Sequence, residues 1–237
     1  MTSASLELHV DDIDGRELIE YQNKHQSPKL VEIIDELKEK GMWNFPFDIF
    51  VAVQLTEPDI FMINTIRQVE IDGTDVESLT KGIIEGRRDN KKLFKIIKEY
   101  FSRFQNARIR EISDVDVIEI RETRRIIGLY TMFTKEALAG KIYKDCIAST
   151  NYNFDLPDPK RPSYDPIMGD TANSDTKREY DVIEIPYRSL LTQPIGNLIV
   201  VCRYVSVERE VLGPVREMGC CMGIGQAAGL VSRYFSR

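Results

Sequence analysis

The chain has 237 residues, of which 42% are hydrophobic and 30% are charged, and this is the composition of a folded globular protein. Its 14 Gly and 10 Pro are too few for a fibrous or low-complexity chain. The formal net charge of -6 argues against general nucleic-acid binding.

The first part of the chain predicts alternating strands and helices. Residues 6–10 predict a strand. Apolar residues at helical spacing after Pro28 predict an amphipathic helix over 28–40, with Gly41 as its stop. Two runs rich in β-branched and aromatic residues, 47–55 and 60–69, predict a hairpin.

A long helix is predicted next. Residues 74–77 form a capping box, and an apolar stripe continues for roughly seven turns. The stripe consists of Leu79, Ile83, Phe94, Ile97, Phe101 and Phe104. The basic residues between 81 and 110 are interpreted as a solvated face rather than a phosphate-binding surface.

The second part of the chain is less regular. A strand is predicted over 109–120, and the Pro- and Asp-rich residues 151–178 predict a long irregular excursion. Strands are predicted over 182–186 and 197–205, followed by a final helix over 217–234.

Two short polar segments are candidate binding elements. In 121–125 a strand would place Arg121, Thr123 and Arg125 on one face and Glu122 with Arg124 on the other. One arginine would then point inward and need an anionic partner, either a carboxylate of the chain or a ligand. Residues 185–189 place the Tyr187 phenol and the Arg188 guanidinium at a strand end, where they could contact a flat polar heterocycle.

The final helix begins with small residues, Met218-Gly-Cys-Cys-Met-Gly223. A ligand could therefore approach its backbone, where free N–H groups and the helix dipole favour negative charge; tight helix packing is the alternative explanation. Residues 223–228 match G-x-G-x-x-A but lie inside this helix, so they are not a dinucleotide-binding fingerprint. The sequence contains no other such motif and no P-loop.

The cysteines and histidines narrow the possible chemistry. The four Cys include no Cys-x-x-Cys pair, and His occurs only at positions 9 and 25, so no metal site is expected. Cys220 and Cys221 would be reactive if they were exposed at the helix start, but burial as small apolar residues is the preferred interpretation. No secretory signal or membrane anchor is recognised, and a cytoplasmic protein is expected.

Several short segments, taken in order, form a recognisable series. They are residues 62–65, 71–75, 85–87, 121–128 with Tyr130, 185–190, 196–200, Met222 and 225–229. This series resembles the C-terminal half of the FAD-dependent oxidoreductases related to glutathione-reductase-type flavoproteins, and the resemblance extends from about residue 5 to the end.

The resemblance implies an FAD site in which the last strand and helix cover the isoalloxazine ring. Helix N–H groups would then face the pyrimidine edge of the flavin, where reduction develops negative charge. The residues implied to bind the cofactor are Arg124, Arg125, Tyr187, Arg188, Arg203, Glu217, Met218, Gly219, Cys220, Cys221, Met222 and Gly223.

Departures from the family pattern bear on cofactor binding. Val201 and Cys202 replace a small Ala-Gly step, and the nucleotide-binding motif of the N-terminal half is not in this sequence. We therefore expect one half or subunit of a split enzyme that transfers hydride through FAD, acts on an unknown small molecule, and needs a nucleotide-binding partner or self-association. The alternative is a degenerate, non-catalytic scaffold without flavin.

The predicted fold class is α+β. Residues 1–180 are expected to form a mixed-sheet substrate or cap region with covering helices, and residues 181–237 to complete an FAD-binding domain through a terminal strand and helix.

Overall fold

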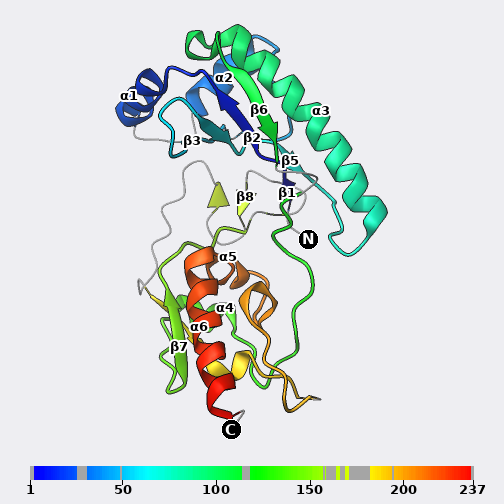
Figure 1. Ribbon diagram of the computed structural model, residues 1–237, viewed down its shortest axis with the longest axis vertical. Coiled ribbons are helices and arrows are strands. Elements are labelled where there is room, and N and C mark those ends of the chain that lie inside the picture. The colour runs from blue at the N-terminus through cyan, green and yellow to red at the C-terminus, as the bar shows by residue number, and fades with distance from the viewer. Residues whose placement is uncertain are drawn as a thin grey trace. The chain divides into compact units, whose positions relative to one another are not determined.

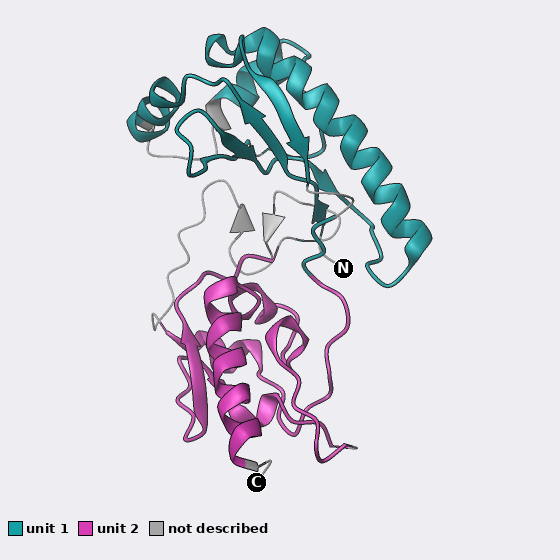
Figure 2. Cartoon of the chain, viewed as in Figure 1, with its two compact units in different colours: residues 1–121, 158–163 teal, residues 122–157, 164–237 magenta. Residues whose placement is uncertain are grey.

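The computed structural model describes residues 3–25, 31–48, 50–113, 118–156, 158, 164–165, 169–170, 182–193 and 195–235. The chain separates into two compact units (Figure 2). Unit 1 contains Met1–Arg121 with Asp158–Ser163, and unit 2 contains Glu122–Pro157 with Tyr164–Arg237. This division follows packing, and the functional division at residue 180 stays a prediction. Helices and antiparallel strand pairs together confirm the α+β class (Figure 1).

Unit 1 is built on a four-stranded antiparallel sheet of order β3-β4-β2-β6. Its strands are β3 (Ala52–Gln54), β4 (Phe61–Ile63), β2 (Leu8–Asp11) and β6 (Arg108–Ile112). The predicted hairpin is confirmed by β3 and β4, although both strands are shorter than expected. Two further strands, β1 (Ala4–Ser5) and β5 (Arg67–Gln68), form a separate antiparallel pair.

Helices pack on one face of this sheet because successive side chains of a strand point to opposite faces, and the apolar ones point to the same face. Leu8 and Val10 are fully buried, whereas His9 between them is partly exposed. The helices are α1 (Gly15–His25), α2 (Val31–Glu39), α3 (Val76–Tyr100) and the short 3-10 helix η1 (Ser102–Phe104). Gly41 adopts a φ of +68°, which confirms it as the stop after α2. The predicted start of α2 at Pro28 lies outside the described residues.

Helix α3 differs from the prediction in its cap and in the first half of its buried stripe. The N-cap is Asp75, whose side chain accepts a hydrogen bond from the Ser78 backbone N–H, so the helix begins one residue later than the capping box implies. The fully buried line then runs through Gly82, Gly86, Asn90, Leu93, Ile96 and Ile97. Leu79 and Ile83 are partly buried and pack against the small core around Leu6, Ile71 and Ile118, so the predicted residues share the inward face with these small residues.

Unit 2 has a separate core between a strand pair and a helix. The antiparallel strands β7 (Cys146–Thr150) and β10 (Ile183–Pro186) pack against α6 (Met218–Phe235). The short helices are α4 (Thr134–Leu138), α5 (Leu212–Val215), η3 (Tyr187–Ser189) and η4 (Cys202–Tyr204). Strands β8 (Tyr164–Asp165) and β9 (Gly169–Asp170) form a further pair. The rest of the predicted 151–178 excursion lies largely outside the described residues.

The predicted strand over 197–205 is wrong. Residues 196–197 form a turn, Ile199 makes an isolated bridge to Leu191, and η4 follows. Cys202 has a φ of +62°, which ends the extended backbone conformation at that residue. An apolar run alone therefore gave the wrong element, because periodicity does not reveal a left-handed residue. The final helix is confirmed, but η4 and α5 precede it instead of a strand.

Candidate functional site

The start of α6 is open to solvent. Met218 and Met222 are 77% and 71% exposed, and a side chain built at Gly219 would meet no atom within 4 Å. The opposite side of the helix carries Cys220, Ile224 and Ala228, which are buried in the core of unit 2. The small residues of α6 thus leave the backbone of its first turn accessible.

Not all of the predicted contacts at this helix are equally accessible. A Cβ at Gly223 would lie 3.4 Å from the Ala148 Cβ on β7, so this glycine faces the packed side. Cys220 is only 5% exposed. The exposed members of the predicted set on α6 are Met218, Gly219 and Met222.

The residues just before α6 are held by Arg216. Its Nη1 lies 3.1 Å from Glu217 Oε1, and its Nη2 donates a 3.1 Å hydrogen bond to the Asp155 carbonyl. The Cys221 backbone N–H donates to the Glu217 carbonyl, which closes the first turn of the helix. Arg216 therefore balances the Glu217 carboxylate beside the positive end of the helix dipole.

Helix η4 brings Cys202 and Arg203 to the same end of α6. It packs against α6, and the Arg203 charge acts on the Cys221 thiol. The structure therefore places Arg203, Glu217 and Cys221 near one another, as the predicted site requires. Arg203 is exposed.

The pKa values of the two thiols on α6 are raised rather than lowered. Burial, together with the neighbouring thiols and Glu217, raises the pKa of Cys220 to about 12. Burial and Cys202 raise the pKa of Cys221 to about 11, while Arg203 acts in the opposite direction. Cys220 thus behaves as the small buried residue that the sequence favoured.

The arginines of 121–125 are arranged differently from the prediction. These residues form no strand, so the predicted alternation of faces is wrong. The buried side chain is Glu122, which is 7% exposed and lies 3.5 Å from Arg125 and 3.2 Å from Arg209. Arg125 therefore has an anionic partner within the chain, whereas Arg124 is exposed.

Arg188 is also held by the protein. Its guanidinium lies 2.5 Å from Asp145 Oδ1 and stacks 4.5 Å from the ring centre of Tyr130. The Tyr187 backbone N–H donates to the Asp145 carbonyl, so both residues of the predicted pair depend on Asp145. Sequence reasoning missed Asp145 because it lies 43 positions from Arg188, and nothing local signals their contact.

The aromatic pair beside Arg188 extends this network. The Tyr143 hydroxyl lies 3.3 Å from that of Tyr130, and Lys141 bonds both Tyr130 and Glu136. Burial and the hydrogen bond with Tyr130 raise the pKa of Tyr143. These side chains form hydrogen bonds with one another, so the cluster fixes the loop around residues 130–145.

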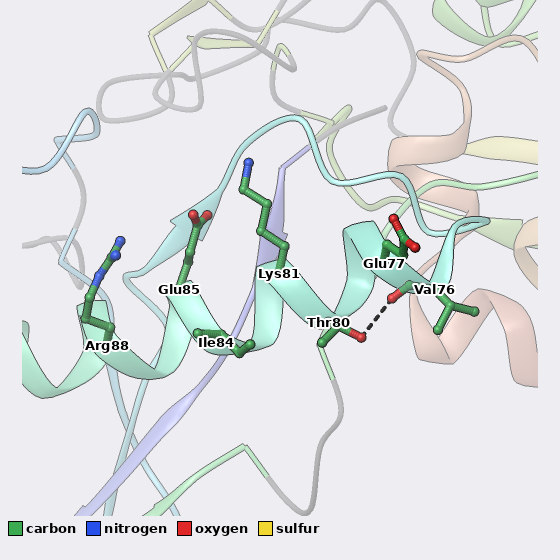
Figure 3. A pocket seen from close by; sticks show the side chains of 7 residues that line it. All are labelled: Val76, Glu77, Thr80, Lys81, Ile84, Glu85 and Arg88. Atoms are coloured by element: carbon green, nitrogen blue, oxygen red, sulfur yellow. Dashed lines mark hydrogen bonds between the residues drawn. The ribbon is translucent and has the colours of Figure 1, made fainter.

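A surface hollow lies along the first turns of α3 in unit 1. It has a volume of about 490 Å³, and its described lining consists of Val76, Glu77, Thr80, Lys81, Ile84, Glu85 and Arg88 (Figure 3). Thr80 donates its hydroxyl hydrogen bond to the Val76 carbonyl. None of the predicted site residues lines this hollow, and its exposed charged side chains agree with a solvated face.

Membrane-spanning helices and metal-binding clusters are both absent from the described residues. Across these ranges, no helix combines the length and apolar character that crossing a bilayer requires. Within the same ranges, no group of His, Cys, Asp and Glu side chains is arranged to hold a metal ion.

A family model described as FAD dependent oxidoreductase matches residues 8–237. The chain therefore belongs to the FAD dependent oxidoreductase family. No curated protein and no solved structure matched it. Family membership identifies the protein as a flavin-linked oxidoreductase family member and FAD as its cofactor.

The start of α6 fits one end of this cofactor. The open space at Gly219 allows a flat ring to approach the backbone, and the leading N–H groups of a helix, those before Cys221 here, have no acceptor within the helix. Arg125 and Arg188, by contrast, are bound to carboxylates of the chain. The residues present thus fit the ring end of FAD at α6.

Proposed function

We propose that this chain forms the ring-covering half of a glutathione-reductase-type FAD-dependent oxidoreductase, which transfers hydride between FAD and a small-molecule substrate. The observation that carries the proposal is the solvent-open, small-residue first turn of α6 in a chain of this family. FAD supplies the hydride chemistry when it is bound.

The chain's own contribution is electrostatic and positional. The N–H groups and dipole at the start of α6 would stabilise negative charge on the pyrimidine edge of a bound flavin. Arg203 adds a positive charge at the same end, and Arg216 pairs with the Glu217 carboxylate, which limits its opposing charge. Exposed Met218 and Met222 would offer flexible apolar contacts to the ring.

The remaining predicted residues take positioning or peripheral roles in this proposal. Arg125 and Arg188 hold the backbone through Glu122 and Asp145. Arg124 and Tyr187 stay candidates for contacts on the substrate side. Cys220, Cys221 and Gly223 support the helix from its packed side.

We further propose that a nucleotide-binding partner completes the cofactor site. The 237 residues contain no G-x-G-x-x-G between a strand and a helix, and the pyrophosphate of FAD is commonly bound by that motif. A ring contact alone leaves the adenosine and phosphate groups without partners. The partner would supply this phosphate site.

Co-expression with a candidate nucleotide-binding partner tests the proposal. We expect FAD absorbance to remain with the complex after gel filtration, and Gly219→Leu to weaken retention at least about tenfold, or about 1.4 kcal/mol. Gly229→Leu is the matched control, because it lies on the same helix and its side chain also meets no atom within 4 Å. Colourless protein with and without the partner would instead support the scaffold alternative.

A further inference from the structure

Three of the four cysteines gather where η4 meets the first turns of α6. The Cys202 thiol interacts with that of Cys221 through a hydrogen bond, and Cys220 is adjacent. The Cys221 Sγ is also 3.3 Å from the Arg216 carbonyl and 3.6 Å from the Val215 carbonyl, so the thiol is held in place. Two thiols from separate segments of unit 2 are thus neighbours.

Cys202 occupies an unfavourable backbone conformation. Its φ of +62° lies in the left-handed region, which is sterically unfavourable for an L-residue other than glycine. The Val205 N–H donates to the Cys202 carbonyl and η4 packs on α6, so the surrounding structure maintains this conformation. A glycine would adopt it without strain, but would supply no thiol beside Cys221.

The thiols do not form a metal centre. Within the described residues no suitable group of ligating side chains is present, and the nearby Glu217 carboxylate is paired with Arg216. Oxidation to a disulfide is a chemistry that requires two thiols side by side, as these are.

We propose that Cys202 and Cys221 are a redox-sensitive pair that closes to an intrachain disulfide when the protein meets hydrogen peroxide. The Cys202 thiolate attacks one peroxide oxygen, the O–O bond breaks, and water and a sulfenic acid result after proton transfer. The Cys221 sulfur then attacks the Cys202 sulfur, the S–O bond breaks and a second water leaves. In total, two thiols are oxidised to one disulfide and one peroxide is reduced to two waters.

The disulfide would link η4 covalently to the first turns of α6. The proposal does not depend on flavin binding, because it concerns only the thiols of this chain. A dithiol reductant would restore the two free thiols by exchange, with its own sulfurs becoming oxidised. Whether the start of α6 is covalently linked to η4 would thus depend on peroxide.

The rate of closure should rise with pH. Burial and Cys202 raise the pKa of Cys221 to about 11, with Glu217 acting in the same direction and Arg203 against it. The Cys221 sulfur reacts as a thiolate, whose population grows up to tenfold per pH unit below the pKa. We expect closure to be at least about tenfold faster at pH 9 than at pH 7.

Peroxide treatment of the reduced full-length chain tests the pair. After quenching with an alkylating agent and proteolysis, mass spectrometry should find a Cys202–Cys221 cross-linked peptide that is two hydrogens lighter than the separate thiol peptides. The link should disappear on reduction with a dithiol. Exposed Cys146 serves as an internal reporter that peroxide has reached the protein.

Matched variants separate the pair from its neighbours. Cys146→Ser and Cys220→Ser should keep the link, whereas Cys202→Gly should abolish it while preserving the fold, because glycine accommodates the φ of +62°. Three results would overturn the proposal: a link from Cys202 to Cys220, a closure rate independent of pH, or full alkylation of Cys202 and Cys221 in a sample whose Cys146 is oxidised.

Discussion

Helices α3 and α6 both carry glycines at short spacing, yet the two sets have opposite environments. A Cβ at Gly82 would lie 2.7 Å from the Ile118 Cδ1, and one at Gly86 would lie 2.8 Å from the Leu6 Cδ1. Side chains at Gly219, Gly225 and Gly229 would meet nothing within 4 Å. In α3 small residues permit close packing, whereas in α6 they leave backbone accessible. Small-residue patterns therefore acquire meaning only from what lies opposite them.

The largest expected effect comes from filling a glycine position in each helix. Gly82→Leu should lower the free energy of unfolding by about 3 kcal/mol, because the new side chain overlaps Ile118 and Ile71 in a packed core. Gly225→Leu should raise it by up to about 1 kcal/mol, because leucine is the better helix former and has space. Urea unfolding of both variants measures the difference, and equal losses would contradict the comparison.

The polar residues of the two helices sharpen the same contrast. Asn90 on α3 is fully buried, and its amide donates a 3.0 Å hydrogen bond to the Leu6 carbonyl. Asn90→Ala leaves that carbonyl without its donor and opens a small cavity, so we expect a loss of about 2 kcal/mol. Gln226→Ala, at an exposed position on α6, should change stability by less than about 0.5 kcal/mol. Thermal unfolding monitored by circular dichroism compares the two variants. An equal loss of stability in Gln226→Ala would show that this face of α6 is covered by other residues.

A smaller effect is expected at the segment that packs on α6. Cys202→Gly should stabilise the reduced protein by about 1 kcal/mol, because glycine adopts the positive φ without the steric cost. Cys202→Ala is the control, because it removes the thiol and keeps the strained backbone. Chemical denaturation under reducing conditions should rank the glycine variant above both the alanine variant and the wild type; the reverse order would contradict the strain.

The difference between α3 and α6 also shows how far the sequence could predict this molecule. Both long helices, the hairpin and the glycine stop after α2 follow from local patterns, and so does the small-residue start of α6, whose role in a cofactor site stays a prediction. Two other ion pairs could not be predicted in this way, because Glu122 meets Arg209 and Asp145 meets Arg188 only through the tertiary fold. The strand predicted over 197–205 failed because one left-handed residue, Cys202, is not visible in a hydropathy pattern.

The smallest effect concerns Glu7. It follows Leu6, the residue that Gly86 packs against. Burial raises the pKa of Glu7, with Glu119 adding to this effect, whereas His9 and Arg121 oppose it. The folded state therefore holds the Glu7 proton more tightly than the unfolded state does. Its contribution to stability is fully present below the unfolded pKa, near 4.5, and is lost as pH rises through the folded value.

Glu7→Gln should consequently stabilise the protein at pH 7 and have little effect at pH 4. The gain should stay below about 1 kcal/mol, because the Glu7 side chain is 26% exposed and water screens part of the charge. Glu77→Gln on the exposed start of α3 is the matched control, and its effect should not depend on pH in this way. Unfolding curves at both pH values decide the sign: a variant that is less stable than wild type at pH 7 would mean that the contact of Glu7 with His9 outweighs the burial of the Glu7 carboxylate.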